Sequence, residues 1–426
     1  MYIANNVRAS GLAGAQPANE SLSHEKAGTP AYPRVLLING QAIGQKSGVG
    51  ATLASMFQGW PLERLAQIVP PMGDPDKSVC KINWICGCRE GAASASYPRG
   101  IKPQLQRKFG NLRRWRVSPE LHKWVADFDP DLIYSYLEHP QITCLIAEIL
   151  RSRAIPVIPH LMDEWHRTPT GLRPAQLWWF FRQQIAFRQI IKQAPFGLAI
   201  SAAMAKDYQT RYRRQFHTFM NSVDPSLYVT RRWVGPSSRL RLIYTGSGPG
   251  LGRWPIILNL VQAVQELNRS GCDIELSAFV RMEFCDNPPV QGDGFALFDF
   301  IDERSLMARL VESDIAILPE GFDQKSITYS RLSCASKLPA YLMSGCCILA
   351  IGPMQNNSIK YVRDNQLGVV LHDPSVQVLR AQLLDLYERR SHVASFHARN
   401  REFALAHHSQ PVVHEQLRIL LNSVQK

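Results

Sequence analysis

The alternation of short apolar runs with amphipathic stretches constrains this chain more than any other feature of its sequence. The runs are rich in Val, Ile and Leu, and most precede segments whose apolar residues recur every three or four positions. Strands that alternate with helices form parallel sheets, because each helix carries the chain back to the edge where the next strand begins. The expected strands are residues 34–39, 131–136, 155–160, 196–201, 240–245, 273–279, 314–318, 346–351 and 368–371. The sequence therefore predicts an α/β protein.

The pattern breaks once and then restarts, which predicts two domains. Residues 225–238 are polar, contain Pro225, Gly235 and Pro236, and show no periodicity. A chain of 426 residues is also longer than one hydrophobic core usually serves. We expect two Rossmann-like domains that face a cleft. The predicted parts are a flexible tail 1–32, a first domain 33–224, a linker 225–238, a second domain 239–400 and a C-terminal helix 401–426.

The charge balance predicts an acidic partner. The chain has 48 Lys and Arg against 35 Asp and Glu, a formal net charge of +13. A phosphate-bearing substrate, an anionic bilayer and a nucleic acid all fit this excess, but no nucleic-acid-binding motif is present, which argues against the last. The excess is concentrated at 99–123 and 177–192, where basic residues alternate with Trp, Phe and Ile. At 99–123 membrane contact and a solvated edge are both open, whereas at 177–192 packing into the core is favoured.

Three features predict a cytoplasmic protein, and the basic segments add a peripheral position on the inner face of the plasma membrane as one option. The tail has no apolar segment of the kind found in secretory signals, and no run reaches the 18 apolar residues of a membrane-spanning helix. The nine cysteines are odd in number and several lie in apolar runs, which indicates reduced thiols. No two have the Cys-x-x-Cys spacing of a zinc or redox site.

Several loops lie where phosphate would bind, because ligands of open parallel sheets bind at the carboxyl ends of strands. Lys337 follows Ser336 at the start of a short helix, and a glycine-rich turn leads from a strand to Arg253. Such turns let a pyrophosphate approach backbone N–H groups, and a basic side chain adds a charge-assisted contact. The glycines of this turn are not spaced as Gly-x-Gly-x-x-Gly, which argues against a dinucleotide site. Glu138 and His139 also follow a strand and are a weaker candidate pair, with loop packing as the alternative.

Residues 336–345 resemble the nucleotide-sugar loop of GT-B glycosyltransferases of the glycosyltransferase 4-like type, usually Lys-Leu-x-Glu-Tyr-x-x-x-Gly. Ala340 stands where that pattern has Glu. The resemblance implies the GT-B fold, with C-terminal helices that return to the first domain. The residues it implies as donor-binding are Gly48, Gly50, Gly246, Ser247, Gly248, Arg253, Glu320, Ser336, Lys337, Leu338 and Tyr341. Residues 155–165 resemble the family's strand end at the acceptor, which implies catalytic roles for His160 and Asp163.

The expected function is transfer of a sugar from a nucleotide-diphosphate donor to a hydroxyl acceptor, with a lipid-linked acceptor as one option, in cell-surface polysaccharide or glycoconjugate synthesis. Arg253, Lys337 and the glycine-loop amides would stabilise the leaving diphosphate in place of a metal, so no metal and no cofactor beside the donor are expected. Asp74, Asp76, Asp127 and Asp129 resemble metal-binding Asp-x-Asp pairs, but they do not end strands. Three alternatives stay open: a nucleotide-binding protein that has lost transfer, a nucleotide-sugar 2-epimerase, and a non-enzymatic membrane- or partner-binding protein.

Overall fold

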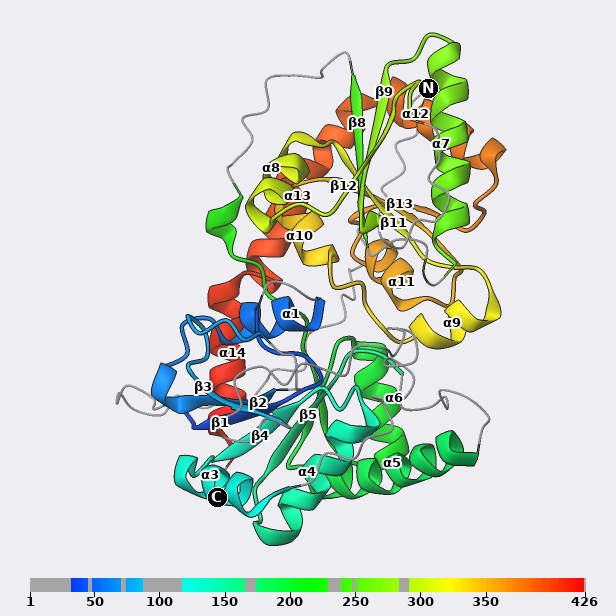
Figure 1. Ribbon diagram of the computed structural model, residues 1–426. Helices are drawn as coiled ribbons and strands as arrows, with labels where there is room; N and C mark the ends of the chain where they lie inside the picture. Colours follow the sequence, from blue (N-terminus) through cyan, green and yellow to red (C-terminus); the bar gives the residue numbers. More distant parts are fainter. Residues whose placement is uncertain are drawn as a thin grey trace, which may run out of the picture. The chain divides into compact units, whose positions relative to one another are not determined.

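The computed structural model describes residues 32–44, 48–69, 74–86, 117–164, 174–228, 239–246, 250, 252–282 and 291–424 (Figure 1). Within these ranges the chain forms two parallel sheets, each with helices on both faces. We call residues 32–228 together with the last helix the first lobe, and residues 239–408 the second lobe. The basic residues at positions 99–116, together with Trp115, lie outside the described residues, as do Ser247 and Gly248.

The first lobe contains a seven-stranded parallel sheet in the order β3-β2-β1-β4-β5-β6-β7 among its described residues. Its strands are β1 (Val35–Ile38), β2 (Leu65–Val69), β3 (Ile82–Ile85), β4 (Leu132–Ser135), β5 (Val157–Leu161), β6 (Gly197–Ala199) and β7 (Phe216–Thr218). Its helices are α1 (Gly48–Phe57), η1 (Leu62–Arg64), α3 (Pro119–Phe128), α4 (Pro140–Ser152), α5 (Pro174–Gln193), α6 (Ala202–Tyr212) and η3 (Pro225–Leu227).

The second lobe contains a six-stranded parallel sheet in the order β10-β9-β8-β11-β12-β13 in its described part. Its strands are β8 (Leu240–Gly246), β9 (Ile274–Val280), β10 (Phe295–Phe298), β11 (Ile315–Pro319), β12 (Cys347–Ile351) and β13 (Gly368–Leu371). Its helices are α7 (Trp254–Arg269), α8 (Glu303–Glu312), α9 (Gln324–Ser330), α10 (Leu338–Met343), α11 (Asn357–Asp364), α12 (Val376–Glu388) and α13 (Arg390–His407).

Burial on both faces explains why the central strands are apolar along their whole length. Every residue of β1, β11 and β12 is buried. The strand order reverses direction between β1 and β4 in the first sheet and between β8 and β11 in the second. In open α/β sheets, ligands bind in the crevice at the carboxyl ends of the strands beside such a reversal. The two reversals therefore show where each lobe is expected to bind a ligand.

The chain returns to the first lobe at its C-terminal end, as expected. Helix α14 (Gln410–Asn422) packs against α1, and Val413, Leu417 and Leu421 are buried in the same core cluster as Phe57. His414 Nε2 lies 2.5 Å from the carbonyl oxygen of Ser55. These contacts confirm the predicted path of the C-terminal helices.

Two further expectations concern the cysteines and membrane-spanning helices. The seven cysteines in the described part of the chain form no disulfide with one another, and five of them are buried. A search of the described helices finds none with the length and apolar character needed to cross a bilayer.

Candidate functional site

Four charged side chains from different elements form one electrostatic cluster. Arg253 precedes α7, Glu320 follows β11 and Lys337 precedes α10, all in the second lobe, while Asp163 follows β5 in the first. Arg253 Nη2 donates a hydrogen bond to Glu320 Oε2 at 3.0 Å and also acts electrostatically on Lys337 and Asp163. β8 and β11 are the strands beside the reversal, so the cluster occupies the edge where ligands of such sheets bind.

Lys337 is held inside the second lobe with its ammonium group against backbone and aromatic rings. Its Nζ donates to the Thr245 carbonyl oxygen at 2.7 Å and lies 4.5 Å from the centre of the Tyr244 ring. Burial, helped by the positive charge of Arg253 and opposed by Glu320, lowers the pKa of Lys337 to about 7. About half of these side chains are therefore uncharged at neutral pH, and an anion placed beside Nζ would favour the charged form.

Arg253 has one donor that the protein leaves unused. Burial alone would lower its pKa, but the Glu320 carboxylate outweighs this effect and raises the pKa of Arg253 above its ordinary value. Glu320 Oε1 accepts a hydrogen bond from Ser358 Oγ at 3.1 Å, which fixes the carboxylate. Arg253 Nε is buried and has no hydrogen-bond partner among the described residues. A buried guanidinium with a spare donor is suited to a phosphate oxygen.

Gly252 makes the approach to Arg253 possible. Its φ is +64°, in the left-handed region that glycine adopts without strain. A Cβ at this position would lie 2.2 Å from Asp323 Oδ2 and 3.3 Å from the Cα of Gly321. The turn between β8 and α7 can therefore pack against the loop after β11 only because residue 252 has no side chain.

Asp163 is the predicted catalytic residue that joins the cluster. Its Oδ1 accepts a hydrogen bond from Ser333 Oγ at 2.5 Å and its Oδ2 accepts one from Tyr329 at 3.4 Å, so both partners come from the second lobe. Burial raises the pKa of Asp163, while Ser333 and Arg253 act against that shift. The carboxylate is therefore within electrostatic reach of Arg253, one of the two cations that the sequence predicts at the donor.

His160, the other residue predicted to be catalytic, has both ring nitrogens in contact with the first lobe. It lies inside β5 and is fully buried, with Nδ1 2.5 Å from Tyr134 Oη and Nε2 3.0 Å from the Phe219 carbonyl oxygen. Because a carbonyl only accepts, Nε2 donates to it and Nδ1 accepts from the tyrosine hydroxyl. Burial lowers the pKa of His160 to about 3, although the Phe219 carbonyl acts in the opposite direction. Both nitrogens are occupied in this arrangement, and the catalytic role of His160 stays a prediction.

Two residues predicted to bind the donor, Leu338 and Tyr341, hold the loop around Lys337 in place, and donor contact at either stays a prediction. Leu338 and Tyr341 are fully buried. The Tyr341 hydroxyl lies 3.0 Å from the Thr245 backbone nitrogen and 2.9 Å from its Oγ1, which ties α10 to the end of β8. Ser336 is exposed, and its carbonyl oxygen accepts a hydrogen bond from Asn221 Nδ2 of the first lobe at 2.7 Å. The motif around Lys337 thus contains one basic side chain, and its other residues hold the loop that carries this side chain.

The predicted glycines occupy different settings. Gly246 ends β8, and a Cβ there would lie 2.4 Å from Tyr244 Oη. Gly48 and Gly50 lie in the first turn of α1, where Gly50 is buried and a Cβ on Gly48 would meet no described atom within 4 Å. Neither has a positive φ, so the backbone does not require glycine there. Open space beside a helix N-terminus is what close approach of an anion needs, and donor contact at these glycines stays a prediction.

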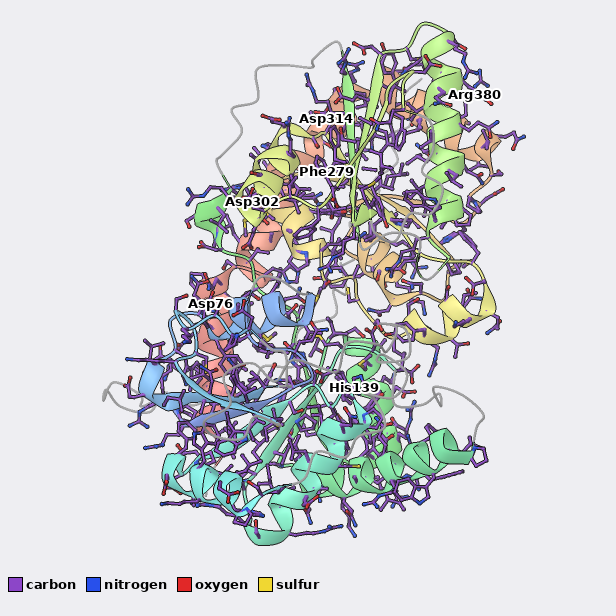
Figure 2. The ribbon with its side chains drawn as sticks, in the orientation of Figure 1. Asp76, His139, Phe279, Asp302, Asp314 and Arg380 are labelled. Atoms are coloured by element: carbon purple, nitrogen blue, oxygen red, sulfur yellow. The ribbon has the colours of Figure 1, made fainter. Side chains whose placement is uncertain are left out.

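Glu138, predicted as a weaker candidate, has a buried carboxyl oxygen without a hydrogen-bond partner among the described residues. It follows β4 at the reversal of the first sheet, and its Oε1 accepts a hydrogen bond from the backbone nitrogen of Gly40, which follows β1. Its Oε2 and the neighbouring His139 Nδ1 (Figure 2) are buried with no partner among the described residues. Burial raises the pKa of Glu138 to about 7. The feature of the sequence that points to Glu138 is a carboxylate close after β4, one of the two strands at the reversal.

Replacing Glu138 with Gln should reduce the loss of stability as the pH rises from about 5 to about 8. A carboxyl with a folded pKa of about 7, raised from 4.5, keeps its proton in the folded chain while the unfolded chain has lost it. Its contribution to stability therefore falls as pH rises from about 4.5 to about 7, by at most about 3 kcal/mol. The thermal unfolding midpoint should fall more between about pH 5 and pH 8 in the wild type than in Glu138→Gln. Equal falls in both, or the same change in the exposed control Glu63→Gln, would contradict this.

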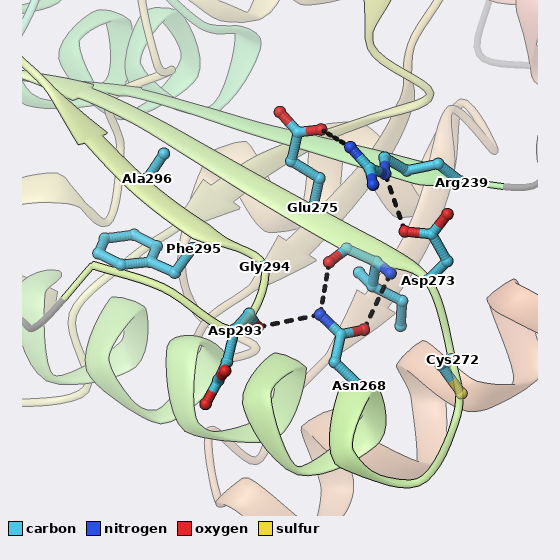
Figure 3. A pocket seen from close by; sticks show the side chains of 10 residues that line it. Arg239, Asn268, Cys272, Asp273, Glu275, Asp293, Gly294, Phe295 and Ala296 are labelled. Carbon is cyan, nitrogen blue, oxygen red and sulfur yellow. Dashed lines mark hydrogen bonds and ion pairs between the residues drawn. The ribbon is translucent and has the colours of Figure 1, made fainter.

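A cavity elsewhere in the second lobe is distinct from this cluster. It has a volume of about 500 Å³ and lies at the amino ends of β8 and β9, lined by Arg239, Asn268 and Asp273 among others (Figure 3). Asn268 bonds the backbone of Ile274 through both ends of its amide, and Arg239 pairs with Asp273 at 2.8 Å. The polar groups that line this cavity bond to one another. The cavity lies at the edge of the sheet opposite to the carboxyl ends of the strands, where ligands bind.

In the described part of the chain, no group of three or more His, Cys, Asp or Glu is placed to hold a metal.

Comparison with protein-family models and with curated proteins gives no match. Solved structures do match over almost the whole chain. HepE of Anabaena, in complex with UDP and glucose, matches with a TM-score of 0.62 at 12% identity, covering 92% of this chain and 100% of HepE. Sucrose-phosphate synthase of Thermosynechococcus elongatus gives 0.61 at 11%, covering 92% and 99%. WaaG, a glycosyltransferase involved in lipopolysaccharide biosynthesis, gives 0.57 at 11%, covering 91% and 99%. The chain therefore has the GT-B fold, as its sequence predicts.

Proposed function

We propose that this protein transfers a sugar from a nucleotide-diphosphate donor to a hydroxyl acceptor. The observation that carries the proposal is the cluster in which Arg253 and Lys337 act on each other at the ligand-binding edge of the second sheet. Two half-buried cations, one of them with an unused N–H donor, suit a diphosphate. The fold adds support, since HepE, which shares it, has been crystallised with UDP and with UDP-glucose.

Cleavage of the bond between sugar and diphosphate places negative charge on the departing nucleotide. Arg253 and Lys337 would stabilise that charge electrostatically, in a role that a metal fills in other enzymes. Arg253 also stands at the N-terminus of α7, whose dipole favours an anion. Asp163, with its raised pKa, would orient the acceptor hydroxyl or receive its proton. Glu138 is a second carboxyl of the first lobe that could serve the acceptor.

The positions of these residues support a separate role for each part of the chain. We assign the acceptor to residues 33–224, the donor to residues 239–400 and the connection to residues 225–238. Movement of the two domains about this connection would exclude water from the donor and limit its hydrolysis. The net charge of +13 supports a lipid-linked acceptor met at the cytoplasmic membrane surface, as in polysaccharide synthesis.

The first test is a thermal-shift screen against UDP-, GDP-, ADP- and dTDP-sugars. One nucleotide should stabilise the protein, by roughly 2.7 kcal/mol when the ligand is at about a hundred times its dissociation constant. Release of the free nucleoside diphosphate in the presence of an acceptor then measures transfer. The proposal fails if none of the four nucleotides shifts the unfolding midpoint.

A second function is favoured by two residues. Ala340 stands where the family pattern has Glu, and His160 is committed to Tyr134 and Phe219. Both fit a protein that binds the nucleotide sugar without transferring it. In that case a nucleotide sugar would shift the unfolding midpoint, but no nucleoside diphosphate would be released with any acceptor.

A further inference from the structure

One face of α5 exposes large apolar side chains to solvent. Trp178 is 51% exposed, Phe181 61% and Ile185 60%, the three highest values for large apolar residues in the described first lobe. Their spacing along the helix places them on one side, because residues three, four and seven apart share a face. The prediction that the apolar residues of 177–192 pack into the core holds only for the opposite side, where Phe187, Ile190 and Ile191 are buried.

The same face is cationic along its second half. Arg188 and Lys192 are exposed and follow Ile185 on that side, about one helical turn apart. The guanidinium of Arg182 lies 4.8 Å from the centre of the Trp178 ring, which places a charge beside the exposed aromatic group. Helix α5 contains no acidic residue. From Trp178 to Lys192 this face is about 21 Å long at 1.5 Å per residue.

We propose that this face of α5 docks the protein on an anionic lipid bilayer. Trp and Phe favour the boundary between headgroups and acyl chains, and Arg and Lys favour an anionic surface. The neighbouring helix α4 extends the basic surface through Arg151, which lines a groove with Arg182 and Glu148 between the two helices. Figure 1 shows α4 and α5 side by side, and the two helices pack against each other.

A bilayer fits this surface better than a protein partner does. A stable protein interface uses roughly 20–30 residues a side, whereas this face offers three apolar side chains and their basic neighbours. Like charges on both sides would also oppose pairing of this face with the same face of a second copy. The inference does not depend on sugar transfer, but it adds to the proposed function by naming the surface at which a lipid-linked acceptor would be met.

Vesicle sedimentation of the full chain, without nucleotide, tests this proposal. The wild type should bind vesicles that contain phosphatidylglycerol and bind much less to phosphatidylcholine alone. The variant Trp178→Ala/Phe181→Ala/Ile185→Ala should lose at least tenfold in partitioning, and Arg188→Gln/Lys192→Gln roughly tenfold or more on anionic vesicles only. The altered side chains are exposed, so circular dichroism and the unfolding midpoint should stay unchanged.

The matched control removes three exposed apolar side chains from other helices, as Leu258→Ala/Leu405→Ala/Ile419→Ala. It should sediment like the wild type. The proposal is overturned if the wild type stays in solution with anionic vesicles, or if the control loses as much binding as the α5 variant. It is also overturned if the α5 variant changes only the oligomeric state in size-exclusion chromatography, since the face would then bind a second copy. Nucleotide-induced shifts measured on the same samples keep this result separate from the proposed function.

Discussion

Lys337→Met should weaken nucleotide-sugar binding and at the same time stabilise the free protein. The pKa of Lys337 falls from 10.5 to about 7 on folding, so at neutral pH the unfolded chain binds a proton that the folded chain holds only in part. This group therefore lowers stability most below about pH 7, and the loss disappears as pH rises toward about 10.5. Methionine has similar length and no charge to bury, and we expect a gain of at least about 1 kcal/mol at pH 7. The lost ammonium–phosphate contact should weaken binding by about 1.5–3 kcal/mol, roughly 10- to 150-fold.

Thermal unfolding with and without the nucleotide sugar measures both effects in one experiment. Lys325→Met is a suitable control, because Lys325 is exposed on α9 in the same lobe and should change neither the midpoint nor the ligand-induced shift. Opposite changes in stability and binding are the diagnostic result, since a side chain that only supported the fold would lower both. If Lys337→Met keeps the full ligand-induced shift, Lys337 does not contact the diphosphate.

The two sheets could be predicted because their central strands are buried on both faces. Such strands are continuous apolar runs, and β12 starts one residue later than predicted and ends at the predicted residue. The strands β3, β7 and β10 were not predicted, and all three lie at sheet edges, where strands are short and partly exposed. Strand β2 was also missed because Gln67 interrupts its apolar pattern. The Gln67 side chain is buried. It accepts a hydrogen bond from Ile43 N and donates one to Asn83, and the sequence alone does not reveal these partners.

The positions of the site loops could be predicted, but the directions of their side chains could not. Strand ends meet at one edge of a parallel sheet, which is why Arg253, Glu320 and Lys337 come together from separate segments. A strand sends successive side chains to opposite faces, so one position decides whether a histidine faces a ligand or the core. His160 lies within β5 and faces Tyr134, whereas Asp163 lies beyond the end of the strand and is free to reach the second lobe.

Arg253→Met should be the most destabilising single change at the site. It leaves the Glu320 carboxylate, whose side chain is 3% exposed, without its cation. Removing one partner of a buried pair costs about 3–5 kcal/mol, and we expect the lower end because the Arg253 side chain is 22% exposed. At about 2–4 °C per kcal/mol, the unfolding midpoint should fall by roughly 6–12 °C. Glu320→Gln should cost much less, since Gln still accepts from Ser358 and the guanidinium can reach water.

The double variant Arg253→Met/Glu320→Gln separates the structural role of the arginine from its role in binding. It removes both charges and keeps the hydrogen bond to Ser358. Its free energy of unfolding should therefore return to within about 1 kcal/mol of the wild-type value. Nucleotide-sugar binding should stay lost in the double variant, because the guanidinium is gone, and should be retained in Glu320→Gln, where Arg253 is released from its carboxylate. A double variant that is stable and still shows the wild-type ligand shift would remove Arg253 from the donor site. A double variant as unstable as Arg253→Met would show that the cost lies in lost packing and not in the unpaired charge.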